Sequence, residues 1–228
     1  DGSKAPAIAS WHDLQTRLAS DKELFGWFIN TSHGVAIIAG QISQGLEIFD
    51  FDNPPELTSY DPQKTIAEWR ELVEETAPGL LGKLPHISTP RGGLHLYFRC
   101  DQIEGNQKLA QLPDAQGKPR AIIETRGEGG YVLAPGCPPG CHPTGKQYSL
   151  IQGDLATIPR ITPAERQVLL DAARALNQHT SPPKNANTHS NQNRTGLRAG
   201  EDFNERGDLG ALLTKHGWKF LGNSSAGE

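Results

Sequence analysis

The 228-residue sequence predicts an α+β fold, built from short antiparallel strands in hairpins with helices between and after them. Several short runs of apolar and β-branched residues are separated by turns that contain glycine or proline, as expected for hairpins. Two stretches carry strong helix-start signals, Asp61-Pro62 and Thr162-Pro163-Ala164-Glu165. The sequence contains neither a glycine fingerprint for a dinucleotide nor a P-loop, so a doubly wound parallel sheet is not indicated.

Apolar spacing and turn residues place the elements in order along the chain. A helix capped by Ser10 is expected first, and the apolar residues 26–29 are expected in the core. Residues 35–39 and 46–52 are predicted to form an antiparallel hairpin, and the polar residues 101–119 a surface excursion. The remaining predicted elements are the helices 62–76 and 163–176 and the strands 86–89, 94–99, 120–126, 131–134 and 147–151.

Composition divides the chain into four parts. Residues 1–9 look like a leader or a cloning remnant, and residues 10–176 form one domain-sized segment. From residue 177 to residue 200 the polar residues Asn, Gln, Ser and Thr dominate without apolar periodicity, which indicates a flexible linker. Residues 201–228 are expected to form a short helical segment that leads to a further C-terminal region.

The bulk composition excludes several classes of protein. The apolar runs are too short to cross a bilayer and no signal peptide is visible, so no membrane partner is expected. A net charge of −4 argues against a generally basic nucleic-acid coat but leaves a local basic groove open. The three cysteines, Cys100, Cys137 and Cys141, are too few and uneven for a secreted disulfide scaffold, which favours the cytoplasm.

The strand 46–52 carries two carboxylates on one face. Because side chains alternate along a strand, Asp50 and Asp52 point the same way, about 7 Å apart. Like charges at this spacing repel each other unless a cation lies between them, and oxygen ligands suit Mg²⁺ or Mn²⁺. A solvated strand end whose aspartates cap the next turn is the alternative.

Two later segments add groups that suit phosphate chemistry. In the turn between residues 86–89 and 94–99, Arg91, Gly92 and Gly93 offer a guanidinium and backbone N–H groups to an anion, although an ordinary hairpin turn is the simpler interpretation. His95 follows on the polar face of its strand, where a hydrogen-bonded sheet histidine is the alternative role.

Glu124 supplies a third acid from a largely apolar strand, and Arg126 on the same face is a candidate partner for it. Two aspartates and one further acid are what a two-metal phosphoryl-transfer site requires.

These segments, Asp50-Phe51-Asp52, the run from Ser88 to His95 and the run from Glu124 to Pro135, resemble the ordered motifs of a primase-polymerase (Prim-Pol) domain. Such domains belong to the archaeo-eukaryotic primase superfamily, here the branch of phages and plasmids, and the resemblance covers roughly residues 10–160. It implies an RRM-like antiparallel sheet with helices plus a smaller α/β subdomain, with the active site in the cleft between them.

The resemblance also implies roles for single residues. Asp50, Asp52 and Glu124 match the metal ligands and catalytic acids, although the third acid is often Asp in this family. His95 matches the histidine that contacts the triphosphate, and the nucleotide-binding set comprises Ser88, Arg91, Gly92, Gly93, His95 and Arg126.

The implied function is template-directed DNA synthesis or priming with two Mg²⁺ or Mn²⁺ ions. Its partners would be single-stranded template DNA, a primer and dNTP or NTP, with a helicase or priming-accessory domain after residue 228. Zinc at Cys137, Cys141 and His142 is a minor alternative, since the spacing differs from a standard knuckle. The rival functions are a metal-dependent nucleotidyl- or glycosyltransferase and a non-catalytic replication-origin DNA-binding module.

Overall fold

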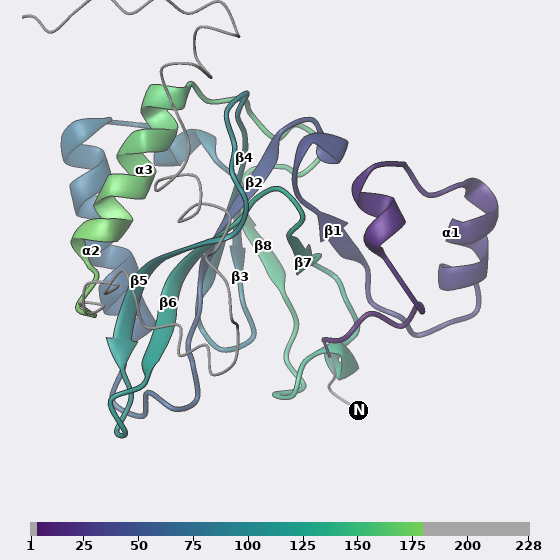
Figure 1. Ribbon diagram of the computed structural model, residues 1–228, viewed down its shortest axis with the longest axis horizontal. Coiled ribbons are helices and arrows are strands. Elements are labelled where there is room, and N and C mark those ends of the chain that lie inside the picture. The colour runs from purple at the N-terminus through teal and green to yellow at the C-terminus, as the bar shows by residue number, and fades with distance from the viewer. Residues whose placement is uncertain (1–3, 180–228) are drawn as a thin grey trace, which may run out of the picture. The chain divides into compact units, whose positions relative to one another are not determined.

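The computed structural model describes residues 4–179, and these form an α+β fold with a six-stranded antiparallel sheet and three α-helices (Figure 1). The strand order in the large sheet is β5-β6-β2-β4-β3-β8, and β1 and β7 form a separate two-stranded sheet. The strands are β1 (Ala36–Ile38), β2 (Leu46–Phe51), β3 (His86–Ser88), β4 (Leu94–Arg99), β5 (Gln107–Pro113), β6 (Pro119–Arg126), β7 (Tyr131–Leu133) and β8 (Ser149–Gln152).

Two of the helices begin where the sequence predicts. Helix α2 (Pro62–Thr76) has Asp61 as its N-cap, and helix α3 (Pro163–Ala175) begins with a capping box formed by Thr162 and Glu165. Both helices lie on one side of the six-stranded sheet (Figure 1). Trp69 of α2 donates a hydrogen bond to the carbonyl of Leu169 in α3 at 3.2 Å, which ties the two helices together.

The central strand β2 builds a core on both of its faces. Phe49 and Phe51 are fully buried and pack with Trp69 in the core under α2 and α3. Leu46 and Ile48 point the opposite way into a smaller core that includes Tyr97, Ile87, Val132 and Tyr148. The alternation predicted for residues 46–52 is therefore confirmed, and it directs Asp50 to the face opposite α2 and α3.

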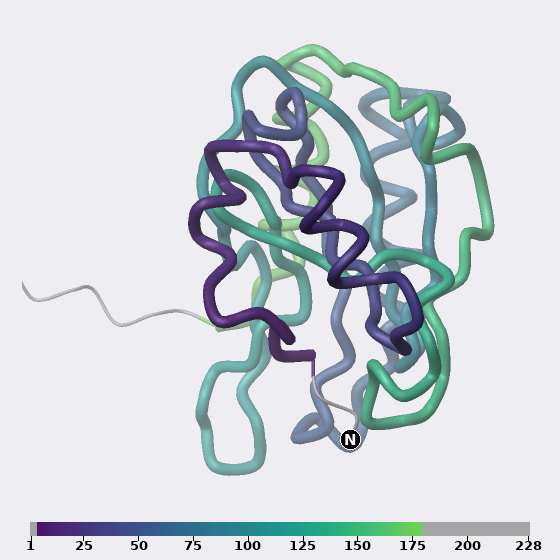
Figure 2. The backbone as a smooth tube through the Cα atoms, turned by 90° about the vertical axis from the view of Figure 1, so that its right-hand side faces the viewer, coloured from purple at the N-terminus to yellow at the C-terminus, as the bar shows by residue number. Residues whose placement is uncertain are grey.

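The N-terminal segment differs from the prediction. The first helical turn is a 3-10 turn at His12–Gln15 without a side-chain cap. The prediction of a helix capped by Ser10 is therefore wrong. Helix α1 (Asp21–Phe28) instead begins at Ser20, which forms a capping box with Glu23, and α1 contains no buried residue. The expectation that residues 26–29 belong to the core is therefore wrong. Figures 1 and 2 place this segment on the side of the sheet away from α2 and α3.

Two strand pairings also differ from the prediction. β1 pairs with β7, with Ala36 opposite Leu133, instead of forming a hairpin with β2. Part of the expected surface excursion is strand β5, which pairs with β6 as the edge of the large sheet. The polar residues of β5 led to the prediction of a surface excursion, but they are compatible with an edge strand because one of its faces lies in solvent. Most of the predicted linker 177–200 and all of segment 201–228 lie outside the described residues.

Candidate active site

Three predicted site residues occupy one row across the large sheet. Asp50 in the centre of β2 lies directly opposite His95 of β4 on one side and Glu124 of β6 on the other. Residues paired in this way across antiparallel strands have side chains on the same face at about 5 Å. The register therefore brings together three residues that are far apart in the chain, since His95 follows Asp50 by 45 positions and Glu124 follows His95 by 29.

Asp50 is the most strongly held acid in this row. Its Oδ1 lies 3.3 Å from His95 Nε2, and its Oδ2 accepts hydrogen bonds from Arg126 Nε and a terminal nitrogen at 3.2 and 3.1 Å. Burial by itself would raise the pKa of Asp50, but His95 and Arg126 together hold it well below its usual range. Asp50 therefore stays ionised although only 9% of its surface is exposed.

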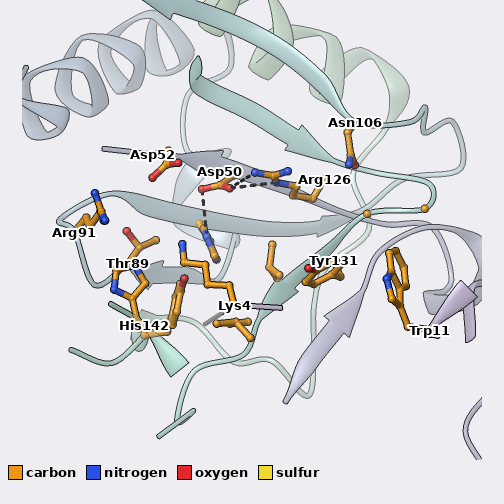
Figure 3. A pocket seen from close by; sticks show the side chains of 16 residues that line it. Lys4, Trp11, Asp50, Asp52, Thr89, Arg91, Asn106, Arg126, Tyr131 and His142 are labelled. Carbon is orange, nitrogen blue, oxygen red and sulfur yellow. Dashed lines mark hydrogen bonds and ion pairs between the residues drawn. The ribbon is translucent and has the colours of Figure 1, made fainter. Parts of the chain in front are cut away.

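Arg126 joins two of the acids. The same terminal nitrogen that contacts Asp50 lies 2.8 Å from Oε2 of Glu124. Burial raises the pKa of Glu124, and the nearby Asp50 carboxylate adds to this effect while Arg126 opposes it. The pairing of Glu124 with Arg126 that the sequence suggested is confirmed, and it extends to Asp50. A cationic side chain thus stands between the two carboxylates, and Figure 3 shows its contact with Asp50.

The glycine turn after β3 packs against the end of β2. Gly92 has φ +83°, and a Cβ on Gly93 would lie 1.8 Å from the carbonyl oxygen of Phe51, so this position has no room for a side chain. Thr89 Oγ1 accepts a hydrogen bond from the Gly93 N–H, and Asn53 donates one to the carbonyl of Arg91. These contacts fix Arg91 beside the acidic end of β2.

A pocket of about 290 Å³ opens over this face of the sheet. Of the predicted residues, five line it: Asp50, Asp52, Arg91, His95 and Arg126. Glu124, Gly92 and Gly93 adjoin it through the contacts above. Ser88 lies elsewhere, since its hydroxyl is directed to the carbonyl of Ser149 at 3.4 Å.

Several pocket residues were not predicted from the sequence. Lys4 and Trp11 come from the N-terminal segment, Tyr131 from β7, and His142 and Tyr148 from the segment before β8 (Figure 3). The ring of Tyr148 lies 5.5 Å from that of His95 and 6.1 Å from that of His142. The sequence marked the loop around His142 only by its proline-rich composition and as a minor zinc alternative, and neither signal indicated a pocket.

The residues suggested for zinc point to different places. The thiols of Cys137 and Cys141 lie against Gly34, where a Cβ would meet them at 3.1 and 2.6 Å, while His142 lines the pocket. Within residues 4–179, no group of three or more His, Cys, Asp or Glu side chains is arranged as a ready metal site. Zinc and the Mg²⁺ or Mn²⁺ pair both stay predictions.

Comparison with known proteins identifies the family. The family model described as bifunctional DNA primase/polymerase, N-terminal (Prim-Pol) matches residues 1–165, which include the row of three residues and the glycine turn. The search of curated proteins gave no match. No helix in residues 4–179 is long and apolar enough to cross a membrane. The resemblance seen in the three motifs is thus confirmed, and the chain belongs to the Prim-Pol family of DNA primase/polymerase domains.

Proposed function

We propose that this domain joins nucleotides on a DNA template by two-metal phosphoryl transfer, with Asp50, Asp52 and Glu124 as the metal ligands. The observation that carries the proposal is the row of His95, Asp50 and Glu124 across β4, β2 and β6. Asp52 follows on the same face and lines the same pocket. Family membership supports DNA primase or polymerase activity, and the row supports the metal-dependent mechanism.

The donor set fits divalent cations of the Mg²⁺ and Mn²⁺ type. Its ligands are carboxylate oxygens, and Asp50 is kept ionised. Arg126 supplies positive charge between Asp50 and Glu124, which indicates that these acids need a cation. When bound, the two ions would activate the primer 3′-hydroxyl and stabilise the charge of the leaving pyrophosphate. Metal loading would have to draw Arg126 away from at least one of its two carboxylates.

The residues on the other side of the pocket are suited to bind the triphosphate. Lys4 and Arg91 form no ion pair within residues 4–179, and the His142 ring lies nearby. All three groups line the same pocket, and partial burial and the positive charges of Lys4 and Arg91 lower the pKa of His142. His95 would add a donor at the same phosphates, since positive groups set where negative charge accumulates lower the barrier.

The finer features implied by the family resemblance belong to the same proposal. We infer that the six-stranded sheet corresponds to an RRM-like sheet and that the pocket over it is the active-site cleft. The partners would be single-stranded template DNA, a primer and dNTP or NTP, in phage or plasmid replication. A helicase or priming-accessory domain would act with it.

Primer extension tests this function. Purified protein is incubated with a primed single-stranded template, all four dNTPs and Mg²⁺ or Mn²⁺, and product length is measured on a gel. Wild type should extend the primer, and D50N/D52N should lose at least about 100-fold in rate, since metal ligands carry the transition-state charge.

Asp171→Asn is the matched control, because Asp171 is an exposed acid of α3 that does not line the pocket. It should extend the primer like wild type. If wild type binds nucleotide or DNA but incorporates nothing with either metal, the binding-module alternative replaces the polymerase. Omitting the primer then separates priming from extension.

A further inference from the structure

The pocket has an aromatic end that the proposed metal and phosphate roles leave unused. Trp11 and Tyr131 both line it, and their rings meet edge to face at 5.0 Å with an interplanar angle of 70°. In Figure 3 they lie at the end of the pocket away from Arg91 and Asp52, with Asp50 between the two ends.

These two rings are not part of the protein core. Neither Trp11 nor Tyr131 belongs to either of the two apolar clusters, and each is only partly buried. Trp11 directly precedes a 3-10 turn that contributes no buried residue. The turn is attached through Gln15, whose side-chain amide donates a hydrogen bond to the carbonyl of Gly129 at 3.4 Å, next to β7. A large aromatic side chain that lines a polar pocket, is partly exposed and belongs to neither apolar cluster is suited to bind a ligand.

The order of chemical groups along the pocket matches one class of ligand. Arg91 and His142 lie at one end together with Asp52, while Lys4 and the Asp50–Arg126 pair lie in the middle, and Trp11 and Tyr131 form an aromatic end (Figure 3). A nucleoside triphosphate has the corresponding order of outer phosphates, reacting α-phosphate and base. We propose that Trp11 and Tyr131 form a stacking site for the base of the incoming nucleotide, an inference that rests on the proposed nucleotidyl transfer.

The chemistry of the pair also predicts its selectivity. Every base has a π-face, so stacking on an indole ring tolerates all four bases. The aromatic end should therefore add affinity for any nucleotide and leave the choice of base to the template.

Equilibrium binding tests the inference without requiring catalysis. The affinities of the full chain for dATP, dCTP and inorganic tripolyphosphate are measured by calorimetry with Mg²⁺ and without DNA. Wild type should bind both nucleotides more tightly than tripolyphosphate. Trp11→Ala should weaken dATP and dCTP by about 10-fold, the size expected for the loss of one base–aromatic stack, and leave tripolyphosphate unchanged. Trp11→Phe should recover most of the affinity, and Tyr131→Leu should show a smaller loss.

The control is Trp27→Ala, which removes an aromatic residue from α1 that does not line the pocket. It should bind all three ligands like wild type. An equal loss for nucleotides and tripolyphosphate in Trp11→Ala would overturn the inference, because it would mean that Trp11 only holds Lys4 in place. Unchanged dATP binding in that variant, or wild type that binds dATP no better than tripolyphosphate, would overturn it as well.

The two proposals fail in different ways. If Trp11→Ala gives the selective loss but wild type extends no primer, the stacking site stands and the polymerase function fails. If wild type extends the primer and Trp11→Ala binds dATP normally, the polymerase function stands and the stacking site fails.

Discussion

At the scale of single residues, Arg126 is the side chain that neutralises the buried carboxylates of the candidate site. It bridges Asp50 and Glu124, and all three side chains are at least two-thirds buried. Removing one partner of such a network leaves the others charged without compensation. The same carboxylates are the proposed metal ligands, so Arg126 and a divalent ion compete for them.

Arg126→Gln should therefore make stability depend on metal. In EDTA we expect the free energy of unfolding to fall by about 2 kcal/mol, less than the ~3–5 kcal/mol for a fully buried pair, because Arg126 is partly exposed. Excess Mn²⁺ should stabilise the variant more than wild type, since the ion then binds without displacing a guanidinium. Urea unfolding with and without Mn²⁺ measures both effects.

Arg120→Gln is the matched control for this experiment. Arg120 is also on β6, bridges Glu56 and Asp114 at 2.9 Å each, and has a similar exposure of 26%. It does not line the site pocket, so its loss should destabilise the protein equally with and without Mn²⁺. Equal Mn²⁺ stabilisation of wild type and Arg126→Gln would contradict the competition.

At the scale of elements, strand β3 carries a buried histidine that makes stability depend on pH. His86 is 4% exposed, and burial, with the nearby Arg70, lowers its pKa from 6.5 to about 4. Between these values the unfolded chain binds a proton that the folded protein does not. Stability is therefore full above pH 6.5 and declines as pH falls towards about 4.

We expect this histidine to account for about 3 kcal/mol of stability lost between pH 7 and pH 4, with a slope of up to ~1.4 kcal/mol per pH unit. Urea unfolding of wild type and His86→Gln across this range isolates the contribution, because other titrating groups are common to both proteins. The exposed His33→Gln should follow the wild-type curve. A His86→Gln curve parallel to wild type would show that His86 is protonated in the folded state.

At the scale of the whole molecule, the net charge predicts how strongly the protein binds DNA and how that binding depends on salt. The net charge is −4, and the cations that line the pocket, Lys4, Arg91 and Arg126, are few. Binding to single-stranded DNA should therefore be weak, with log K falling against log salt at a slope of about −2, as expected for roughly three phosphate contacts. Fluorescence anisotropy with labelled oligo-dT over a range of KCl concentrations measures this slope. A slope steeper than about −5 would indicate an extended basic surface instead.

The comparison between sequence and structure separates local from non-local information. The alternation of residues 46–52 and the capping residues of α2 and α3 are local signals, and the strand and the two helix starts predicted from them are confirmed. The grouping of Asp50, His95 and Glu124 was expected only from the resemblance to Prim-Pol domains, because β2 pairs with β4 and β6, which do not follow it directly in the chain.

What the sequence could not predict depends on long-range packing. The pairing of β1 with β7 and the arrival of Lys4 and Trp11 at the pocket join segments that are far apart in the chain. An isolated aromatic residue or lysine carries no sign of which pocket it will reach. Glu47 is a further example, since its partner Arg166 in α3 is not a sequence neighbour.

The alternation of β2 restricts how the length of this chain can change in evolution. Inserting or deleting one residue before Asp50 would turn the carboxylates into the apolar layer beneath α2 and bring phenylalanine into the pocket. The turn between β5 and β6, at residues 114–118, has no such two-sided role, because it ends an edge hairpin. Natural relatives of this domain should therefore vary in length at that turn and keep the spacing of β2 unchanged.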